Sequence, residues 1–372
     1  MLFPPVAAVQ RCRIFSGIYQ LLKEVMRSAC EGQAINEAAM PAGLWLAVHG
    51  NVPTREKMEA LSHSLSNITH AEKQIVLNFI NTPLLIRDLL GNRLTAIPQA
   101  PLSIVKTLKD CVSHLFDGTA KLVAVETACN DRLINFFHRY SADYPVGNGI
   151  VCGFCGSAEL SQWRQGIPDG EQWRSDFDHF LSESGYPLIA LDSDNLIPAC
   201  HFCNSKAKRN KDVLFDSKGV RRLCFDPWAE CAAQQLSMSF VKSTQEIVSS
   251  IEVTFAPNSP DDAERLGTWD DVYQIKSRIA GHFSSMHIVL QGMLDFESLD
   301  EFKGSIAKYA ANKEDFWRRR AYNYWYWLLC ISLTSLDDQH LNALREVCAQ
   351  VYQNEVPLCD ANYGDLIAQQ LQ

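Results

Sequence analysis

The sequence predicts a mainly α-helical protein with a small α+β insert in the middle of the chain. Apolar residues recur at helical spacing before the insert, as over 14–25, and again after it. Two Cys-x-x-Cys pairs mark the insert itself, and turn-forming residues cluster at 141–149 just before it. We therefore expect a helical domain over 1–145, a cysteine-containing module over 146–228 and a mainly helical domain over 229–372.

Composition and charge restrict the class of protein. The 372 residues are 47% hydrophobic and 21% charged, as in a globular protein with room for two or three domains. The net charge of -9 excludes a uniformly basic surface, so any face that binds nucleic acid must be local. No apolar run is long enough for a membrane span, and the apolar first residues lack a basic leader and a cleavage site. We therefore predict a cytoplasmic protein without membrane contact.

Before the insert, the pattern predicts a series of amphipathic helices over 11–142. Pro101 opens one of them, and Gly118 should close it in the left-handed conformation. The residues 122–140 should then form one long amphipathic helix.

After the insert, the sequence again favours helices. The residues 229–249 have a helical pattern, whereas 251–255 alternate like a short strand. Ser259 or Asp261 could cap the next helix, and the remainder through Leu371 is expected to be helical.

Within the insert, two short strands should flank a loop. Asp178, His179 and Phe180 are expected to end the first strand, and 195–199 should form the second. The residues after Cys203 contain no helix breaker, so the second cysteine pair should stand at the start of a helix.

The insert's four cysteines have the spacing of a metal site; they are Cys152, Cys155, Cys200 and Cys203. Each short pair can supply two thiolates from a tight turn, and a structural zinc ion takes four such ligands. Gly156 suits a knuckle whose backbone must turn with positive φ. A closed site of this kind is structural, because it leaves no position for water. The alternative is four unrelated core cysteines, and a disulfide is disfavoured in the cytoplasm.

An Asp178-His179 dyad lies between the two cysteine pairs, and Asn204 directly follows the last cysteine. A histidine with a pKa near neutrality can accept a proton from water. Carboxylate and amide oxygens are hard ligands that suit Mg²⁺ or Mn²⁺. A lone Asp-His pair has little meaning by itself. Its position inside a zinc clamp favours a one-metal site for phosphodiester hydrolysis.

In order and spacing, these motifs resemble the HNH endonuclease family. The resemblance covers 151–228 and includes the knuckle, the dyad, the lysines after Asn204 and the run Asn195-Leu-Ile-Pro-Ala-Cys-His-Phe-Cys-Asn204. It implies a ββα-metal module on a treble-clef zinc scaffold, flanked by the two helical regions. The run 178–187 is similar to a subgroup that often serves bacterial anti-phage systems beside an ATPase partner.

The resemblance also implies a role for each site residue. His179 matches the general base that activates water, while Asp178 and Asn204 match the ligands of a catalytic Mg²⁺ or Mn²⁺ ion. Asn195 matches the residue that braces the loop between the strands and orients the base. The four cysteines match the ligands of the structural zinc ion.

Basic residues after Asn204 are candidate contacts to nucleic acid; they are Lys206, Lys208, Arg209 and Lys211. A solvated basic face is an equally weighted alternative. The family's usual lysine stands three residues after the asparagine, where this chain has Ala207. Glu183 stands where the subgroup tends to have a lysine, so its loop is expected to point away from a bound phosphate or to serve regulation.

Together, these motifs predict a metal-dependent HNH endonuclease that acts on DNA ahead of RNA, as the effector of an anti-phage defence system. The expected partners are the nucleic acid and a protein such as an ATPase, because the chain has no P-loop of its own. Two alternatives stay open. One is a non-catalytic treble-clef module that binds nucleic acid or protein, and the other is a structural adaptor that keeps only the nuclease geometry.

Overall fold

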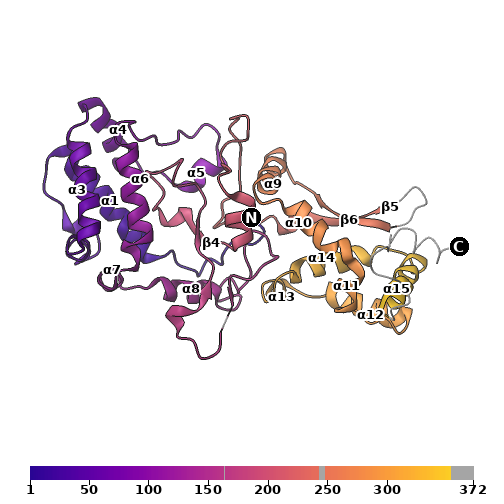
Figure 1. Ribbon diagram of the computed structural model, residues 1–372. Helices are drawn as coiled ribbons and strands as arrows, with labels where there is room; N and C mark the ends of the chain where they lie inside the picture. The colour runs from indigo at the N-terminus through magenta and orange to yellow at the C-terminus, as the bar shows by residue number, and fades with distance from the viewer. Residues whose placement is uncertain (163, 243–247, 353–372) are drawn as a thin grey trace. The chain divides into compact units, whose positions relative to one another are not determined.

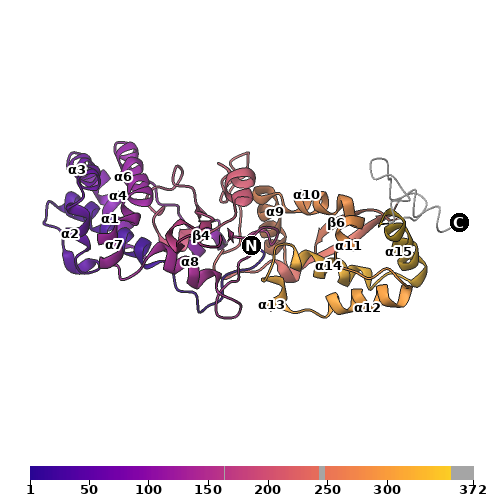
Figure 2. The ribbon, with the colours of Figure 1, turned by 60° about the horizontal axis from the view of Figure 1, so that its bottom comes forward.

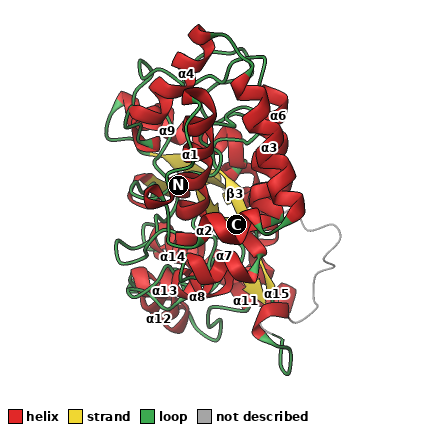
Figure 3. Cartoon of the chain, turned by 90° about the vertical axis from the view of Figure 1, so that its left-hand side faces the viewer, coloured by secondary structure: helices red, strands yellow, loops and turns green. Residues whose placement is uncertain are grey.

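The computed structural model describes residues 1–162, 164–242 and 248–352. Helices dominate, and the described strands pair into small antiparallel sheets (Figure 3). The prediction of a mainly α-helical protein with a small α+β part is confirmed at this level. Among the described residues, no helix is both long and apolar enough to cross a bilayer. The end of the predicted helical region, 353–371, lies outside the described residues.

The chain folds into two compact units, each of which draws on separated stretches of sequence. The N-terminal unit contains residues 4–148 and 160–230. The C-terminal unit contains residues 1–3, 149–159 and the chain from Cys231 onward, described through Tyr352. The predicted division into 1–145, 146–228 and 229–372 is a different partition, and it stays a prediction.

The first part of the N-terminal unit is helical, with α1 Arg13–Glu31, α2 Leu44–His49, α3 Val52–Ser66, α4 His70–Asn81, α5 Ile86–Gly91, α6 Val105–Asp117, α7 Val123–Ala128 and α8 Leu133–Ser141. Helix α1 packs against α3 and α4, and α3 packs against α6 (Figure 1). The residues Ile14, Ile18 and Leu21 of α1 are buried, as its periodicity predicts. Asn51 caps α3, and Thr69 forms a capping box on α4.

Two predictions about these helices are wrong in detail. The expected long helix over 122–140 is divided into α7 and α8, and the break falls at Asn130, which has a left-handed φ of 47°. The neighbouring Asp131 is buried, and its carboxylate accepts hydrogen bonds from Arg139 and from the backbone N–H of Arg132. Gly118 has φ −102°, outside the left-handed region, because the chain continues from α6 directly into a 3-10 helix, η2 Thr119–Lys121.

The second part of the N-terminal unit carries two small hairpins. Strand β1 Ser161–Gln162 pairs with β2 Trp173–Arg174, and β3 Phe177–His179 pairs with β4 Leu196–Pro198. The two strands expected at 178–180 and 195–199 are therefore present, with Asp178 opposite Ile197. A π-helix, η5 Phe202–Lys208, follows β4. The short 3-10 helices among the described residues are η1 Glu37–Ala39, η2, η3 Asp169–Glu171, η4 Ser193–Asn195, η6 Ala233–Gln235 and η7 Phe283–Ser285.

The C-terminal unit combines a β-hairpin with helices. Its elements are β5 Leu236–Lys242, β6 Val248–Phe255, α9 Pro260–Tyr273, α10 Ile275–His282, α11 Met286–Gln291, α12 Leu299–Ala310, α13 Glu314–Trp317, α14 Asn323–Leu333 and α15 Asp338–Tyr352. Strand β6 contacts α10, β5 contacts α14, and α12 packs against α14 and α15 (Figure 2). Ser259 caps α9 by accepting a hydrogen bond from the N–H of Asp262, as the sequence predicts.

The prediction of a helix over 229–249 is wrong, because β5 occupies 236–242 and β6 begins at Val248, while 243–247 lie outside the described residues. Leu236 and Met238 are buried and the serines between and after them are exposed, which is the two-residue period of a strand. Met238 lies opposite Val253 of β6, which is also buried. The partner strand thus decides a segment whose apolar residues fit either period.

Candidate metal centre and active site

The first cysteine pair lies in a tight knuckle. The N–H of Gly156 donates to the carbonyl of Cys152 over 2.9 Å, and the N–H of Ser157 donates to Cys155 Sγ over 3.4 Å. Gly156 has φ 65°, which confirms the predicted positive φ. A Cβ at this position would lie 2.5 Å from Leu2 Cδ2, so the end of the Leu2 side chain would have to shift to make room for it.

Three backbone carbonyls of the knuckle accept hydrogen bonds from other residues of the same unit. Trp325 Nε1 donates to the carbonyl of Cys155 over 2.8 Å, and Trp269 Nε1 donates to the carbonyl of Phe154 over 2.9 Å. The N–H of Tyr322 donates to the carbonyl of Gly156 over 2.8 Å. Because these carbonyls are satisfied by buried donors, the helices α9 and α14 fix the orientation of the cysteine turn.

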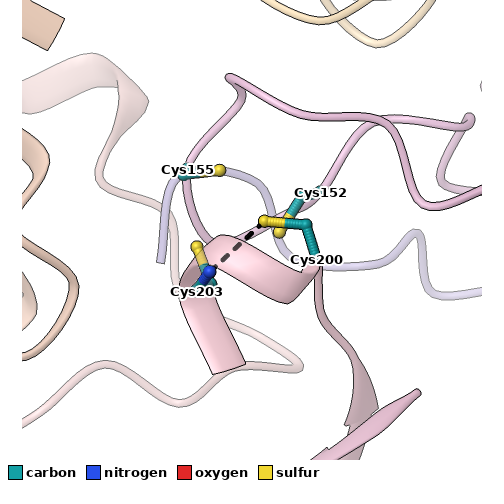
Figure 4. Close-up of side chains that lie close together, drawn as sticks. All are labelled: Cys152, Cys155, Cys200 and Cys203. Atoms are coloured by element: carbon teal, nitrogen blue, oxygen red, sulfur yellow. Dashed lines mark hydrogen bonds between the residues drawn. The ribbon is translucent and has the colours of Figure 1, made fainter. Parts of the chain in front are cut away.

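The second pair stands where a helix begins, as predicted. Cys200 directly precedes the helical segment, and Cys203 is in the first turn of η5. The N–H of Cys203 donates to Cys200 Sγ over 3.4 Å, shown as the dashed line in Figure 4.

The four cysteine sulfurs converge on one point (Figure 4). All four side chains are buried, and their Sγ atoms lie within 4.8 Å of one another. Four sulfurs around one zinc ion at about 2.3 Å would stand about 3.8 Å apart, so the cluster needs only a small contraction to close around an ion. The predicted set Cys152, Cys155, Cys200 and Cys203 could therefore hold a metal ion, and none of the four forms a disulfide with a described residue.

Asp178 and His179 stand at the end of β3. Asp178 is 2% exposed, and its Oδ1 accepts a hydrogen bond from Lys208 Nζ over 2.5 Å. Its second oxygen, Oδ2, is buried without a hydrogen-bond partner among the described residues. The Nε2 atom of His179 is likewise buried without a hydrogen-bond partner among the described residues. An unpartnered buried carboxylate oxygen and imidazole nitrogen are costly in a folded protein, and such atoms mark positions that a ligand can satisfy.

The imidazole of His179 is kept neutral by its surroundings. Burial, and then the positive charge of Lys208, lower the pKa of His179 from 6.5 to about 4. The ring centroid lies 4.3 Å from that of Phe116 on α6, which covers one side of the imidazole. The imidazole is therefore unprotonated at physiological pH and has a free nitrogen lone pair, although a pKa of about 4 makes it a weaker proton acceptor than a histidine with a pKa near neutrality.

Asn195 ties down the loop that follows the dyad. Its Oδ1 accepts from the N–H of Leu181 over 2.6 Å, and its Nδ2 donates to the Leu181 carbonyl over 2.9 Å. The backbone N–H of Phe180 donates to the Asn195 carbonyl over 2.9 Å. Asn195 is fully buried, so these bonds replace its contacts with water. The loop brace that the sequence predicts has its counterpart here, although Asn195 reaches the residues after His179 rather than the imidazole.

A cavity of about 600 Å³ brings the predicted site residues together. Asp178, His179 and Asn204 all line it, although they come from β3 and η5. Its other charged lining residues are Asp117, Lys121, Arg174, Asp176, Glu183, Lys208 and Arg209. Lys121 on η2 and Arg174 on β2 were not identified from the sequence, because no local motif links them to the dyad. Only the fold places them at this wall.

The predicted basic residues fall into different positions. Arg209 lines the cavity and is exposed, whereas Lys206 is exposed and Lys211 half-buried, and neither of these two lysines lines the cavity. Lys208 is only 3% exposed, and its amine also donates to the carbonyl of His179. In the wide turn of a π-helix, four residues complete slightly less than one turn, as three residues do in an α-helix. Lys208 can therefore take the place that a lysine three residues after Asn204 would have.

Glu183 lines the cavity. The expectation that the loop containing Glu183 points away from the site is therefore wrong. Burial, with a smaller contribution from the negative charge of Asp117, raises the pKa of Glu183. A raised pKa means that this carboxyl keeps its proton to a higher pH than an exposed glutamate does.

Comparisons with known proteins find no match for this chain, whether with family models, curated proteins or solved structures. A function must therefore be inferred from the residues and distances of the site. The two features available for that inference are the Cys₄ cluster and the cavity that contains Asp178 and His179.

Proposed function

We propose that the protein is a metal-dependent endonuclease of the HNH type, in which a ββα-metal module on a treble-clef zinc scaffold hydrolyses phosphodiester bonds. The observation that carries the proposal is the pair of unpartnered buried atoms, Asp178 Oδ2 and His179 Nε2, in a cavity that Asn204 also lines. A base, a carboxylate and an amide oxygen in one cavity are the groups that such hydrolysis requires.

The Cys₄ cluster is assigned the structural role. Four thiolates complete the tetrahedral coordination of zinc and leave no position for water or substrate. The cluster includes Cys203, the neighbour of Asn204, so an ion there would fix the start of η5 and with it one wall of the cavity. In such small sites the free energy of zinc binding contributes directly to folding.

The donor set in the cavity fits a hard divalent cation. Asp178 offers a buried oxygen without a partner, and Asn204 lines the same cavity with a side-chain amide. Carboxylate and amide oxygens suit Mg²⁺ or Mn²⁺, and neither residue offers a soft sulfur ligand. When bound, the ion would supply positive charge that stabilises the negative charge developing on the phosphate oxygens.

The chain's own residues supply the remaining steps. His179, neutral at physiological pH, accepts the proton of the attacking water at Nε2. Phe116 limits the rotation of the imidazole, and Asn195 holds the loop after it. The residues that would hold the phosphates on either side of the scissile bond are Lys121, Arg174 and Arg209.

The biological setting of the proposal depends on the sequence resemblance. We place the protein in the cytoplasm, with DNA as substrate ahead of RNA and a protein such as an ATPase as its partner. Its role would be that of the effector of a bacterial anti-phage system. Lys206 and Lys211 lie outside the cavity and would contact nucleic acid that extends beyond the site.

The decisive experiment compares wild-type protein with His179→Ala on plasmid DNA and on structured RNA, with Mg²⁺ or Mn²⁺. We expect cleavage by the wild type and a loss of about 10²-fold or more in the variant, as for removal of a general base. His138→Ala is the matched control, because His138 is exposed on α8 and lies outside the cavity. Undiminished cleavage by His179→Ala would rule out the assigned base.

A non-catalytic module that binds nucleic acid or protein is the second candidate. Its protein-binding form is favoured by the four carboxylates in the cavity wall and by the net charge of -9, since both disfavour a phosphate-rich ligand. This candidate predicts no cleavage under any divalent-ion condition, with DNA or RNA retained in gel-shift assays where the ligand is nucleic acid and not retained where it is protein. Metal-dependent cleavage that is lost in His179→Ala excludes it.

A further inference from the structure

The contact between Lys208 and Asp178 bears on how the cavity would take up a divalent ion. The Lys208 amine is held by Asp178 Oδ1 and by the carbonyl of His179, and both ion-pair side chains are 3% exposed. We propose that Lys208 is an internal cation that competes with the divalent ion for Asp178 and transfers to a substrate phosphate when the ion binds. The proposal rests on the nuclease function and deepens it, because it names how metal and nucleic-acid binding are coupled.

Competition follows from the charge of the carboxylate. Asp178 carries one negative charge, and Lys208 already neutralises it at Oδ1. The other oxygen, Oδ2, is buried and has no hydrogen-bond partner among the described residues, so it is the one open to a second cation. Two cations on one buried carboxylate repel each other strongly, because little water lies between them to screen the charges. A divalent ion at Asp178 must therefore weaken or displace the amine.

The position of Lys208 allows its amine to move. Lys208 is the last residue of η5, and the next residue, Arg209, leaves the helix with a φ of 50°. Lys208 lines the same cavity of about 600 Å³ as Asp178, so the amine can turn into that space by side-chain rotation. Its four-carbon stem has enough rotatable bonds for this without a change in the backbone.

A phosphate is the natural second partner of the displaced amine. A buried ammonium group that loses its carboxylate needs another anion or water, since leaving it unpaired is costly. Lys121, Arg174 and Arg209 line the same cavity and give it a set of cations suited to the phosphates of a nucleic acid. Because the amine serves either Asp178 or a phosphate, metal binding and nucleic-acid binding should each strengthen the other to the same extent.

The first test measures Mn²⁺ affinity by electron paramagnetic resonance of the free ion, in the full-length protein with its zinc bound. We expect Lys208→Gln to bind Mn²⁺ about tenfold more tightly than wild type, as expected from the loss of a competing charged hydrogen bond. Lys218→Gln is the matched control, because Lys218 is exposed and the change in charge is the same. Equal or weaker binding by Lys208→Gln overturns the competition. If neither protein binds Mn²⁺, the divalent-ion assignment of the proposed function fails, and the inference fails with it.

A second test uses the wild-type protein and so does not depend on how a variant folds. Lysine amines are acylated with a small reagent, and labelling is quantified by mass spectrometry, with the exposed Lys206 as the internal reference. We expect Lys208 to be protected without added divalent ion and to approach the labelling of Lys206 at saturating Mn²⁺. A DNA oligonucleotide added to the His179→Ala protein with Mn²⁺ should restore protection. Continued protection of Lys208 in Mn²⁺-saturated wild-type protein contradicts the transfer.

Discussion

Replacing Asn195 by Ala should destabilise the N-terminal unit by about 2–6 kcal/mol. The change removes the partner of the Leu181 N–H, at 2.6 Å, and the partner of the Leu181 carbonyl, at 2.9 Å. Leu181 is fully buried, so water cannot replace these partners. Each buried backbone group left unsatisfied costs about 1–3 kcal/mol, and two such groups set the range. A third, longer bond to the carbonyl of Ala190, at 3.4 Å, adds little.

The loss is measured by urea unfolding followed by circular dichroism, with the transition midpoint and slope compared between variants. Asn210→Ala is the control, because Asn210 is exposed and its removal should change stability by less than about 0.5 kcal/mol. We also expect slower cleavage by Asn195→Ala, because the freed loop directly follows His179. A stability loss in Asn195→Ala as small as that of the control would refute the argument that this side chain holds the loop.

The remaining predictions concern the metal cluster and pH. Cys200→Ser should lose stoichiometric zinc, measured by elemental analysis, while most of its helical circular dichroism signal remains. Cys224→Ser is the control and should keep its zinc, because Cys224 is buried outside the cluster. Full zinc occupancy in Cys200→Ser would count against a Cys₄ site. The pKa of His179 is lowered from 6.5 to about 4, so between these values the unfolded chain binds more protons than the folded one. The free energy of unfolding should therefore fall as the pH is lowered from 6.5 towards 4. It should fall less steeply in His179→Phe, which lacks the imidazole. Identical pH dependence of the two proteins would show that the imidazole does not titrate in this range.

The two cysteine pairs and the dyad could be identified from the sequence because their chemistry is local. A knuckle places Cys152 and Cys155 within one turn, and the positive φ of Gly156 is a requirement of that same turn. The short strands around the dyad were likewise readable from the residues that form them. Local spacing carries this information because neighbouring residues cannot be far apart in any fold.

The errors share a physical cause. The residues 236–242 have apolar positions that fit a helix or a strand, and the pairing of β5 with β6 decides between them. The break between α7 and α8 depends on Asp131, whose carboxylate is held by Arg139 from the following helix. In both cases a contact with the next element of the chain outweighs the local preference.

By itself, the sequence determined which residues are chemically suited to bind metal and accept a proton, since thiols, carboxylates and imidazoles in a given order follow from the chain alone. Only the tertiary structure decided their surroundings. It placed Lys208 on Asp178, 30 positions earlier in the chain, and covered His179 with Phe116. The physical reason is that ionisation and ion pairing depend on burial and on charges within a few ångströms, and these are set by how distant segments pack.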